Sequence, residues 1–343
     1  MKRRKRGGKR EVTDRGRQVE GQPPDGGPVR HIPVLLQEVL RALSPRAAER
    51  YIDGTFGAGG YARAILDAAD CEVLALDRDP AAIAAGRGLE TASAGRLKLK
   101  ETTFSRMQEA AHAIGWERVD GVVLDLGVSS MQLDEAGRGF SFIRDGPLDM
   151  RMSGEGLSAA DVVNTFEKDD IANILYKLGE ERRSRAIAAA IVRDREQAPF
   201  ERTGQLASLV ERVLGRSPGD AKHPATRTFQ ALRLYVNDEL GELERALAAA
   251  EQILRPGGRL AVVSFHSLED RIVKVFLTER SGKRPRASRY VPAEPEGAAP
   301  TFELKDRHGV EPSEEETAAN PRARSARLRS AIRTGAPVGA IGR

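Results

Sequence analysis

The sequence predicts an α/β fold in which strands and helices alternate and one long helical segment is inserted. Three observations support it. A short apolar strand ending in Asp53 leads into a glycine-rich turn and then into a segment with helical character. Two further apolar strands each end in a carboxylate, Asp77 and Asp125. The next clear strand, 259–265, begins over 130 residues after the fourth, which is too far for a single crossover helix.

The remaining elements follow from hydrophobic period and from helix start and stop signals. Ahead of the insertion, strands are expected at 51–53, 72–77, 97–100 and 120–125. Helices are expected at 33–43, after the glycine-rich turn as far as about residue 69, from Pro80 onward, and at 106–115. After it, we expect a helix at 267–277, a loose proline-rich segment at 281–321, and edge strands around 301–305 and 325–330.

The long gap between the fourth and fifth strands has helical periodicity. Ile171, Ile174 and Leu175 fall on one helical face, and Ile187 and Ile191 on another. We therefore expect three regions, namely a disordered basic tail over 1–30, a discontinuous sheet domain over 31–133 and 236–335, and an inserted helical domain over 134–235.

Composition limits the possible functions. Hydrophobic content of 40% fits a soluble globular protein, and a single cysteine, Cys71, excludes a disulfide framework and a cysteine-rich metal site. No segment is apolar enough for a signal peptide or a membrane span, so a cytoplasmic protein is expected. The net charge of +5 arises in the tail, because residues 1–30 carry ten Lys and Arg against four Asp and Glu. The remainder sums to −1, so overall charge is weak support for RNA binding.

The glycine-rich turn indicates a nucleoside-containing cofactor. Glycine lets the backbone approach a ligand, and the helix that follows offers free N–H groups. Asp77 lies 20 residues beyond Gly57 and is placed to accept hydrogen bonds from ribose hydroxyls. The same spacing fits a dinucleotide, so this stretch alone does not select the cofactor.

Seven motifs are distributed along the chain from about His31 to about Arg329. They are His31-Ile-Pro-Val, Asp53-Gly-Thr-Phe-Gly-Ala-Gly-Gly, Asp125-Leu-Gly-Val-Ser-Ser, Pro224-Ala-Thr-Arg, Val236-Asn-Asp-Glu-Leu, Ser264-Phe-His-Ser-Leu-Glu-Asp-Arg and Asn320-Pro-Arg-Ala-Arg. Together they resemble the bacterial RsmH family (older name MraW), whose members are class I S-adenosylmethionine-dependent methyltransferases that act on cytosine N4 of 16S rRNA. The resemblance implies a Rossmann-like, mixed seven-stranded sheet, with methylation of cytosine 1402 in the decoding centre of the small ribosomal subunit.

The resemblance also implies the cofactor site. S-adenosylmethionine would contact Gly59, Gly60, Tyr61, Asp77, Phe104, Asp125 and Gln132. Many relatives have His at the position of Tyr61 and Pro at that of Met131, so this chain departs from the family pattern at both.

Methyl transfer from a sulfonium is an in-line displacement that depends on alignment and needs no metal. Asp125 is the expected catalytic residue, as an acceptor for the target amine or through placing the cofactor. The turn that other amino-methylating enzymes use there, Asp/Asn/Ser-Pro-Pro-aromatic, is absent. Expected substrate contacts are Ser129, Ser264, His266 and Arg271, and candidate RNA phosphate contacts are Arg138, Arg151, Lys222, Arg227 and Arg233.

Two alternatives remain open. The chain could be a methyltransferase for another substrate, such as DNA, another rRNA site or a protein. It could also be a nucleotide-binding dehydrogenase or a non-catalytic RNA-binding module. No catalytic His, Lys and Tyr set follows the glycine loop, which disfavours the dehydrogenase. The intact loop and strand-end acids disfavour a module that only binds.

Overall fold

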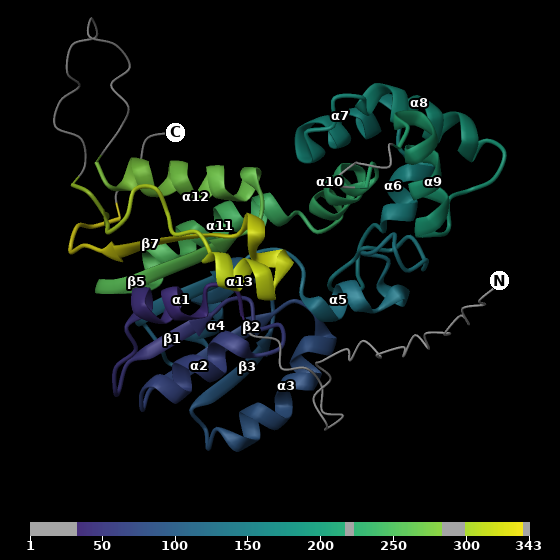
Figure 1. Cartoon of the computed structure of the whole chain (residues 1–343). Helices are drawn as coiled ribbons and strands as arrows, with labels where there is room; N and C mark the ends of the chain where they lie inside the picture. Colours follow the sequence, from purple (N-terminus) through teal and green to yellow (C-terminus); the bar gives the residue numbers. More distant parts are fainter. Residues whose placement is uncertain (1–32, 217–222, 283–298, 339–343) are drawn as a thin grey trace, which may run out of the picture. The chain divides into compact units, whose positions relative to one another are not determined.

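A computed structural model describes residues 33–216, 223–282 and 299–338. Its centre is a seven-stranded sheet with the order β3-β2-β1-β4-β5-β7-β6 (Figure 1). The first five strands pair in parallel, while β7 pairs antiparallel with both β5 and β6. The strands are β1 (Arg50–Asp53), β2 (Glu72–Asp77), β3 (Leu97–Glu101), β4 (Val119–Asp125), β5 (Leu254–Ser264), β6 (Phe302–Leu304) and β7 (Arg327–Arg333).

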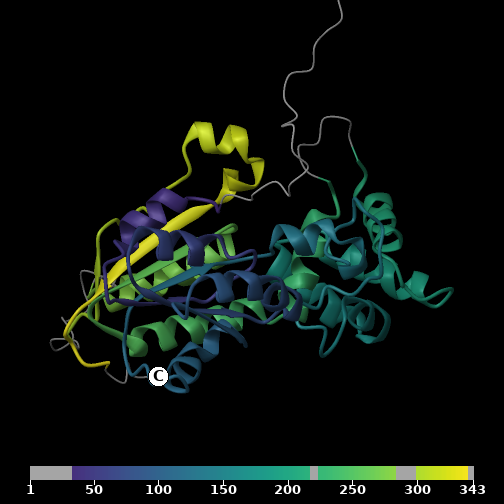
Figure 2. The same ribbon diagram turned by 90° about the horizontal axis from the view of Figure 1, so that it is seen from below.

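Helices cover both faces of the sheet (Figures 1 and 2). Successive residues of a strand point to opposite faces, so Ile52 and Tyr51 of β1 belong to different cores. One core packs against α4 (Met107–His112), α11 (Glu239–Ile253) and α12 (Ser267–Arg280). The other packs against α1 (Leu36–Leu43), α2 (Gly60–Ala68) and α3 (Pro80–Ala92). A strand buried on both faces is a continuous apolar run, which is why the sequence predicts β4 clearly.

The segment between β4 and β5 is helical. It contains α5 (Ser130–Asp134), α6 (Ala159–Thr165), α7 (Lys168–Gly179), α8 (Ser184–Arg195), α9 (Thr203–Leu214) and α10 (Thr226–Val236), and the 3₁₀ turn η2 (Ala136–Arg138). These helices share a hydrophobic core of their own, which includes Ile171, Leu175, Ile187 and Leu232. The expected helical content is confirmed, whereas the division into domains at 134 and 235 stays a prediction.

The structure confirms the α/β fold with its mixed seven-stranded sheet and corrects several bounds. The first helix begins at Leu36, and β5 begins at Leu254 because that residue already pairs with Val119 of β4. The segment 281–321, expected to be loose, contains α13 (Glu314–Ala319), and the sequence also does not predict the 3₁₀ turns η3 (Pro321–Ser325) and η1 (Phe104–Arg106). Ser313 caps α13 by accepting the N–H of Glu316. The tail over 1–30 lies outside the described residues.

Two glycines in α3 allow a test of packing beside the glycine-rich turn. A Cβ at Gly86 would lie 2.4 Å from Cε1 of Phe56, whereas a Cβ at Gly88 would meet nothing within 4 Å. Gly86→Ala should therefore lower the free energy of unfolding by about 1–3 kcal/mol through overpacking. Gly88→Ala should raise it by roughly 0.5–1 kcal/mol, because glycine is unfavourable inside a helix. Urea unfolding of both variants measures the difference, and equal effects would contradict the packing shown here.

Candidate active site

Three carboxylates meet at one edge of the sheet. The strand order places β2, β1 and β4 side by side and parallel, so their final residues Asp77, Asp53 and Asp125 lie at the same carboxyl edge. Asp53 is fully buried, and its two oxygens accept the N–H groups of Thr55 and Ala62, each at 3.1 Å. Burial, reinforced by the charge of Asp77, raises the pKa of Asp53 to about 7. Asp53 thus ties the start of the glycine-rich turn to the beginning of α2.

The glycine-rich turn is packed tightly against the rest of the protein. Gly57 and Gly59 have positive φ angles of 51° and 76°, a conformation that favours glycine. A Cβ at Gly59 would lie 2.9 Å from the ring of Phe56, and one at Gly60 would lie 2.3 Å from Cγ of Pro33. The turn therefore offers backbone rather than side chains to a ligand.

Tyr61 points into the core. Its side chain is buried, and its hydroxyl donates to the carbonyl of Val34. Burial raises the pKa of Tyr61 well above its ordinary value. We therefore expect only the backbone of Tyr61 to contact the cofactor. The side chain joins α2 to the segment before α1.

Asp77 is linked to Gln132, which is also expected to contact the cofactor. Its carboxylate accepts the N–H groups of Gly57 and Asp79, both at 2.8 Å. Asp79 in turn accepts a hydrogen bond from Nε2 of Gln132 at 2.9 Å. Gln132 also forms a capping box with Ser129 at the start of α5. Burial raises the pKa of Asp77, while the two N–H bonds oppose that rise. The structure therefore brings Asp77, Gln132 and Ser129 together through Asp79.

Asp125 holds an unsatisfied buried oxygen. The residue keeps some exposed surface, yet its Oδ1 is enclosed and has no hydrogen-bond partner among the described residues. Burial and the nearby charges of Asp53 and Glu269 raise the pKa of Asp125 well above its ordinary value. An orphaned polar atom is costly unless a ligand satisfies it, so Asp125 is a suitable partner for a polar ligand atom.

A small cavity is lined by the two residues that follow Asp125, Leu126 and Gly127. Its volume is about 40 Å³, and Phe104 contributes to its wall as expected. Its lining also includes the buried carboxylate of Glu269, which belongs to the capping box at the start of α12. The full lining is Thr55, Arg78, Phe104, Leu126, Gly127, Met152, Glu239, Glu242, Leu243 and Glu269.

Glu269 remains ionised although it is buried. Burial itself favours the neutral form, but the hydrogen bond and charge of His266, the charge of Arg233 and the N–H of Phe265 together lower the pKa of Glu269. Its Oε1 lies 3.0 Å from Nε2 of His266, and Oε2 accepts the N–H of Phe265 at 2.8 Å. The sequence contains a signal for this role of Glu269. An acid three residues after a helix cap that follows a strand can complete the capping box and also face a ligand site at the strand end.

The other residues of the Ser264–Arg271 motif separate. The hydroxyl of Ser264 donates to the carbonyl of Arg327 in β7 and is buried there. His266 is the N-cap of α12. Arg271 is exposed and lies 3.7 Å from Glu180. The motif therefore brings His266 and Glu269 together, with Ser264 turned toward the neighbouring strand.

Four of the candidate phosphate contacts already have partners. Arg138, Arg151 and Arg233 pair with Asp79, Asp149 and Glu239 respectively. Arg227 donates to the carbonyl of Glu180. Lys222 lies outside the described residues.

Comparison with known proteins identifies the family. The model of the MraW methylase family matches residues 28–334. The chain belongs to the MraW methylase family. It is 60% identical over 91% of its length to the "Ribosomal RNA small subunit methyltransferase H" of Xanthobacter autotrophicus, and covers 90% of that relative. The protein of the same name from Parvibaculum lavamentivorans is 61% identical, over 90% of each chain. A solved rRNA methylase from Streptococcus thermophilus aligns with a TM-score of 0.40 at 9% identity, over 89% of this chain and 99% of that one, a likeness too low to bear on the site.

As a family member, the protein is a methyltransferase whose cofactor is S-adenosylmethionine. The site suits that cofactor, since it combines a backbone-lined glycine turn, a strand-end carboxylate and an unsatisfied buried oxygen. Within the described ranges, no three His, Cys, Asp or Glu side chains are grouped to hold a metal, and no helix has the length and apolar character to cross a membrane.

Tyr61→Phe tests whether this side chain serves the core rather than the cofactor. Loss of the buried hydroxyl leaves the carbonyl of Val34 unpaired, so the free energy of unfolding should fall by about 1–2 kcal/mol. The dissociation constant for S-adenosylmethionine, measured by calorimetry, should stay within about twofold of wild type. A tenfold loss of cofactor affinity with unchanged stability would show that the hydroxyl reaches the cofactor.

Proposed function

We propose that this protein transfers a methyl group from S-adenosylmethionine to N4 of cytosine 1402 in 16S rRNA, within the small ribosomal subunit in the cytoplasm. The observation that carries the proposal is family membership over nearly the whole chain. Curated relatives about 60% identical are named as methyltransferases of small-subunit ribosomal RNA. The position and the atom come from the resemblance of the motifs around Asp53, Asp125 and Ser264.

The chemistry of a cytosine amine suits the acids of this site. The lone pair of N4 is delocalised into the ring, so the nitrogen becomes a better nucleophile when acceptors hold its two hydrogens. S-adenosylmethionine supplies an electrophilic methyl group. An ionised carboxylate is a strong acceptor for such an N–H group, and Glu269 is held in that form beside the cavity.

The pKa values of Asp125 and Glu269 are shifted in opposite directions. That of Asp125 is raised, which favours the neutral carboxyl, and that of Glu269 is lowered, which favours the carboxylate. Two neighbouring carboxyls with pKa values pushed apart are typical of a site that divides roles between them. We infer that Glu269 accepts an amine hydrogen while Asp125, as a neutral carboxyl, positions the cofactor or the base.

His266 has a supporting role in this proposal. It caps α12 and lies against Glu269, so it helps to hold the carboxylate in place. The product ammonium loses its proton readily, so a general base would add little. Gly59, Gly60, Asp77, Phe104 and Gln132 would hold the cofactor, and Ser129, His266 and Arg271 would face the RNA. The helices of the insertion 134–235 would form the RNA-binding side of the cleft.

The two acids should respond differently to isosteric substitution. Glu269→Gln keeps an acceptor for the N–H of Phe265 but removes the charge, and should lower the single-turnover rate by about 10²-fold or more. Asp125→Asn resembles the protonated carboxyl and should retain most activity, whereas Asp125→Ala should lose it severely. Methyl transfer to unmethylated small subunits at saturating cofactor measures all three. Wild-type rates in Glu269→Gln would remove that residue from the reaction.

The function itself is tested by mass spectrometry of 16S rRNA. Cells that lack this gene should lose one methyl group at N4 of cytosine 1402, and complementation with the wild-type gene, but not with Glu269→Gln, should restore it. An unchanged cytosine 1402, or loss of a methyl group elsewhere, would refute the assigned position.

A further inference from the structure

The described part of the insertion contains a set of cations without protein partners. Ten of its Lys and Arg side chains have a hydrogen-bond or ion-pair partner: Arg138, Arg144, Arg151, Arg193, Arg195, Arg202, Arg212, Arg216, Arg227 and Arg233. Five have none among the described residues: Lys168, Lys177, Arg182, Arg183 and Arg185.

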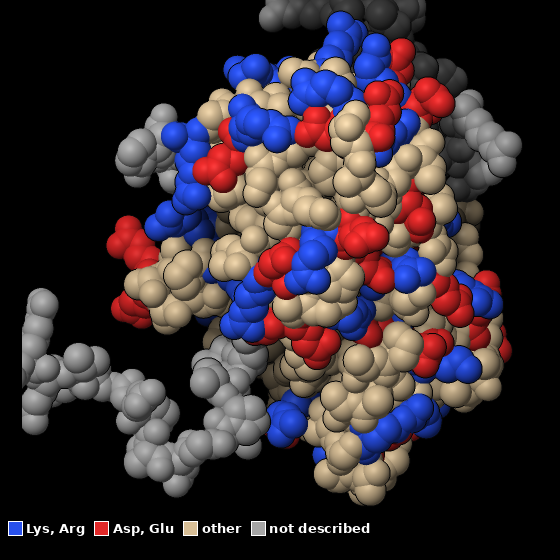
Figure 3. Space-filling view, turned by 90° about the vertical axis from the view of Figure 1, so that its right-hand side faces the viewer, with Lys and Arg blue, Asp and Glu red and all other residues tan. Residues whose placement is uncertain are grey.

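These five cations all lie within 168–185, which covers α7, the turn after it and the start of α8. All of them are exposed. Single exposed cations are ordinary, but here they are confined to one stretch of the insertion. Figure 3 shows acidic and basic side chains interspersed over this side of the molecule, so the feature is the lack of partners rather than a continuous basic surface.

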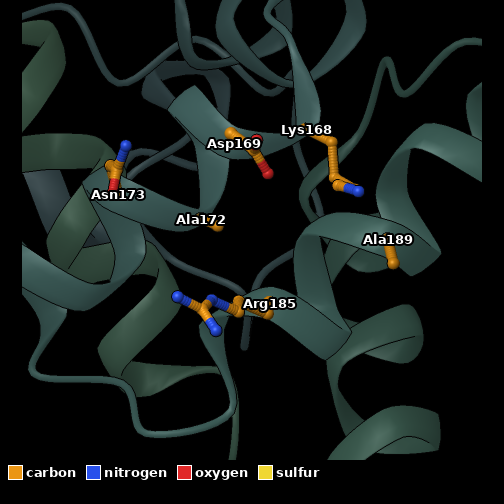
Figure 4. Close-up of a pocket in the computed structure, with 6 residues that line it drawn as sticks. All are labelled: Lys168, Asp169, Ala172, Asn173, Arg185 and Ala189. Carbon is orange, nitrogen blue, oxygen red and sulfur yellow. The ribbon is translucent and has the colours of Figure 1, made fainter.

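Two of the unpartnered cations line a hollow. It lies between α7 and α8, has a volume of about 500 Å³, and receives Lys168 from one helix and Arg185 from the other (Figure 4). Asn173 adds an amide, and Asp169 contributes the single acid of the lining. Two cations, an amide donor and one carboxylate leave a net positive lining, which suits the phosphate of a nucleic acid.

One face of α7 extends from this hollow toward the Ser264–Arg271 motif. Asp169, Asn173 and Tyr176 follow at intervals of four and three residues, which places them along one side of the helix, and Glu180 is the cap at its end. The helical rise makes this stripe roughly 16 Å long. At its far end Glu180 accepts a hydrogen bond from Ser267 at 3.3 Å and lies 3.7 Å from Arg271.

An exposed aromatic ring lies between the two ends of the stripe. Tyr176 is 63% exposed and makes no ring contact or hydrogen bond with the described residues. Single-stranded RNA is bound by pairing its phosphates with cations and by stacking its bases on aromatic rings. The stripe offers both, and it ends beside the helix that carries Glu269.

We propose that the hollow between α7 and α8, together with Tyr176 and Arg182, is a docking site for the RNA strand that flanks the target base. Lys168 and Arg185 bind a phosphate in the hollow, Tyr176 stacks on an unpaired base, and Arg182 binds a phosphate nearer to Arg271. This inference rests on the proposed function only in taking RNA as the substrate.

The charge test compares two arginines whose side chains lack partners among the described residues. Arg185→Ala should raise KM for unmethylated small subunits by about 3- to 10-fold, with kcat and cofactor affinity unchanged. Arg46→Ala is the matched control, because Arg46 is exposed and precedes β1 at the opposite edge of the sheet. Neither side chain supports the fold, so both variants should melt as wild type does.

Substitutions at two further residues distinguish a loss of RNA contacts from a general loss of structure. Asp169→Asn removes the acid of the hollow and should tighten binding by about 2- to 5-fold. Tyr176→Phe should bind as wild type, whereas Tyr176→Ala should bind about 3- to 10-fold more weakly. The dependence of log K on log salt concentration should become shallower by about 0.7 for each RNA phosphate that Arg185→Ala leaves without its cation.

The binding partner is identified by using protein-free RNA as the probe. Binding of a 16S rRNA fragment should weaken in Arg185→Ala as it does for whole subunits. Equal KM and salt slope in Arg185→Ala and Arg46→Ala would overturn the proposal, and so would a weakening seen with subunits but not with RNA, which would indicate a ribosomal protein. The methylated position is read separately in the wild-type enzyme, so an error in the assigned cytosine would leave this result interpretable.

Discussion

The site depends on buried carboxylates that bind backbone N–H groups at the end of parallel strands. Asp53 holds the N–H groups of Thr55 and Ala62, and Asp77 holds those of Gly57 and Asp79. These bonds set the path of the glycine-rich turn and of the turn that leads into α3. Each carboxylate is costly to bury, and the raised pKa of Asp53 reflects that cost. The predicted cofactor site is therefore a backbone surface already shaped by the protein.

The surroundings of two neighbouring acids shift their pKa values in opposite directions. Asp125 has an enclosed oxygen without a partner among the described residues, and burial raises its pKa. Glu269 is buried as well, but His266, Arg233 and the start of α12 surround it with hydrogen-bond donors and positive charge. Burial alone would raise both pKa values, so the difference comes from the partners that each carboxyl receives.

The insertion uses most of its arginines for its own structure. Arg233 pairs with Glu239 where α10 leads back to the sheet domain, and Arg138 joins η2 to Asp79 in the turn before α3. These contacts fasten the helical segment to the carboxyl edge of the sheet. In the described part of the insertion, the cations without a protein partner lie on α7, in the turn after it and at the start of α8, and these remain available to a nucleic acid.

Much of this protein was determined by local sequence. Apolar runs that end in Asp53, Asp77 and Asp125 predicted β1, β2 and β4 and the edge at which they meet, because a strand buried on both faces must be apolar throughout. The glycine-rich turn predicted a ligand site, and the long gap before β5 predicted an insertion. The family resemblance also placed Asp77 and Gln132 in one predicted cofactor site, and the structure connects them through Asp79.

Tertiary structure decided which side chains reach the site. Tyr61 and Ser264 stand in cofactor and substrate motifs, yet their hydroxyls bond to Val34 and Arg327, which are distant in sequence. Glu269 has the sequence pattern of a helix cap and becomes a charged wall of the cavity, because Arg233 is brought near it from the insertion. Arginines that look alike in sequence divide into paired and unpaired ones only when the chain folds. Direction, burial and pairing depend on contacts between distant residues, and local patterns carry no information about them.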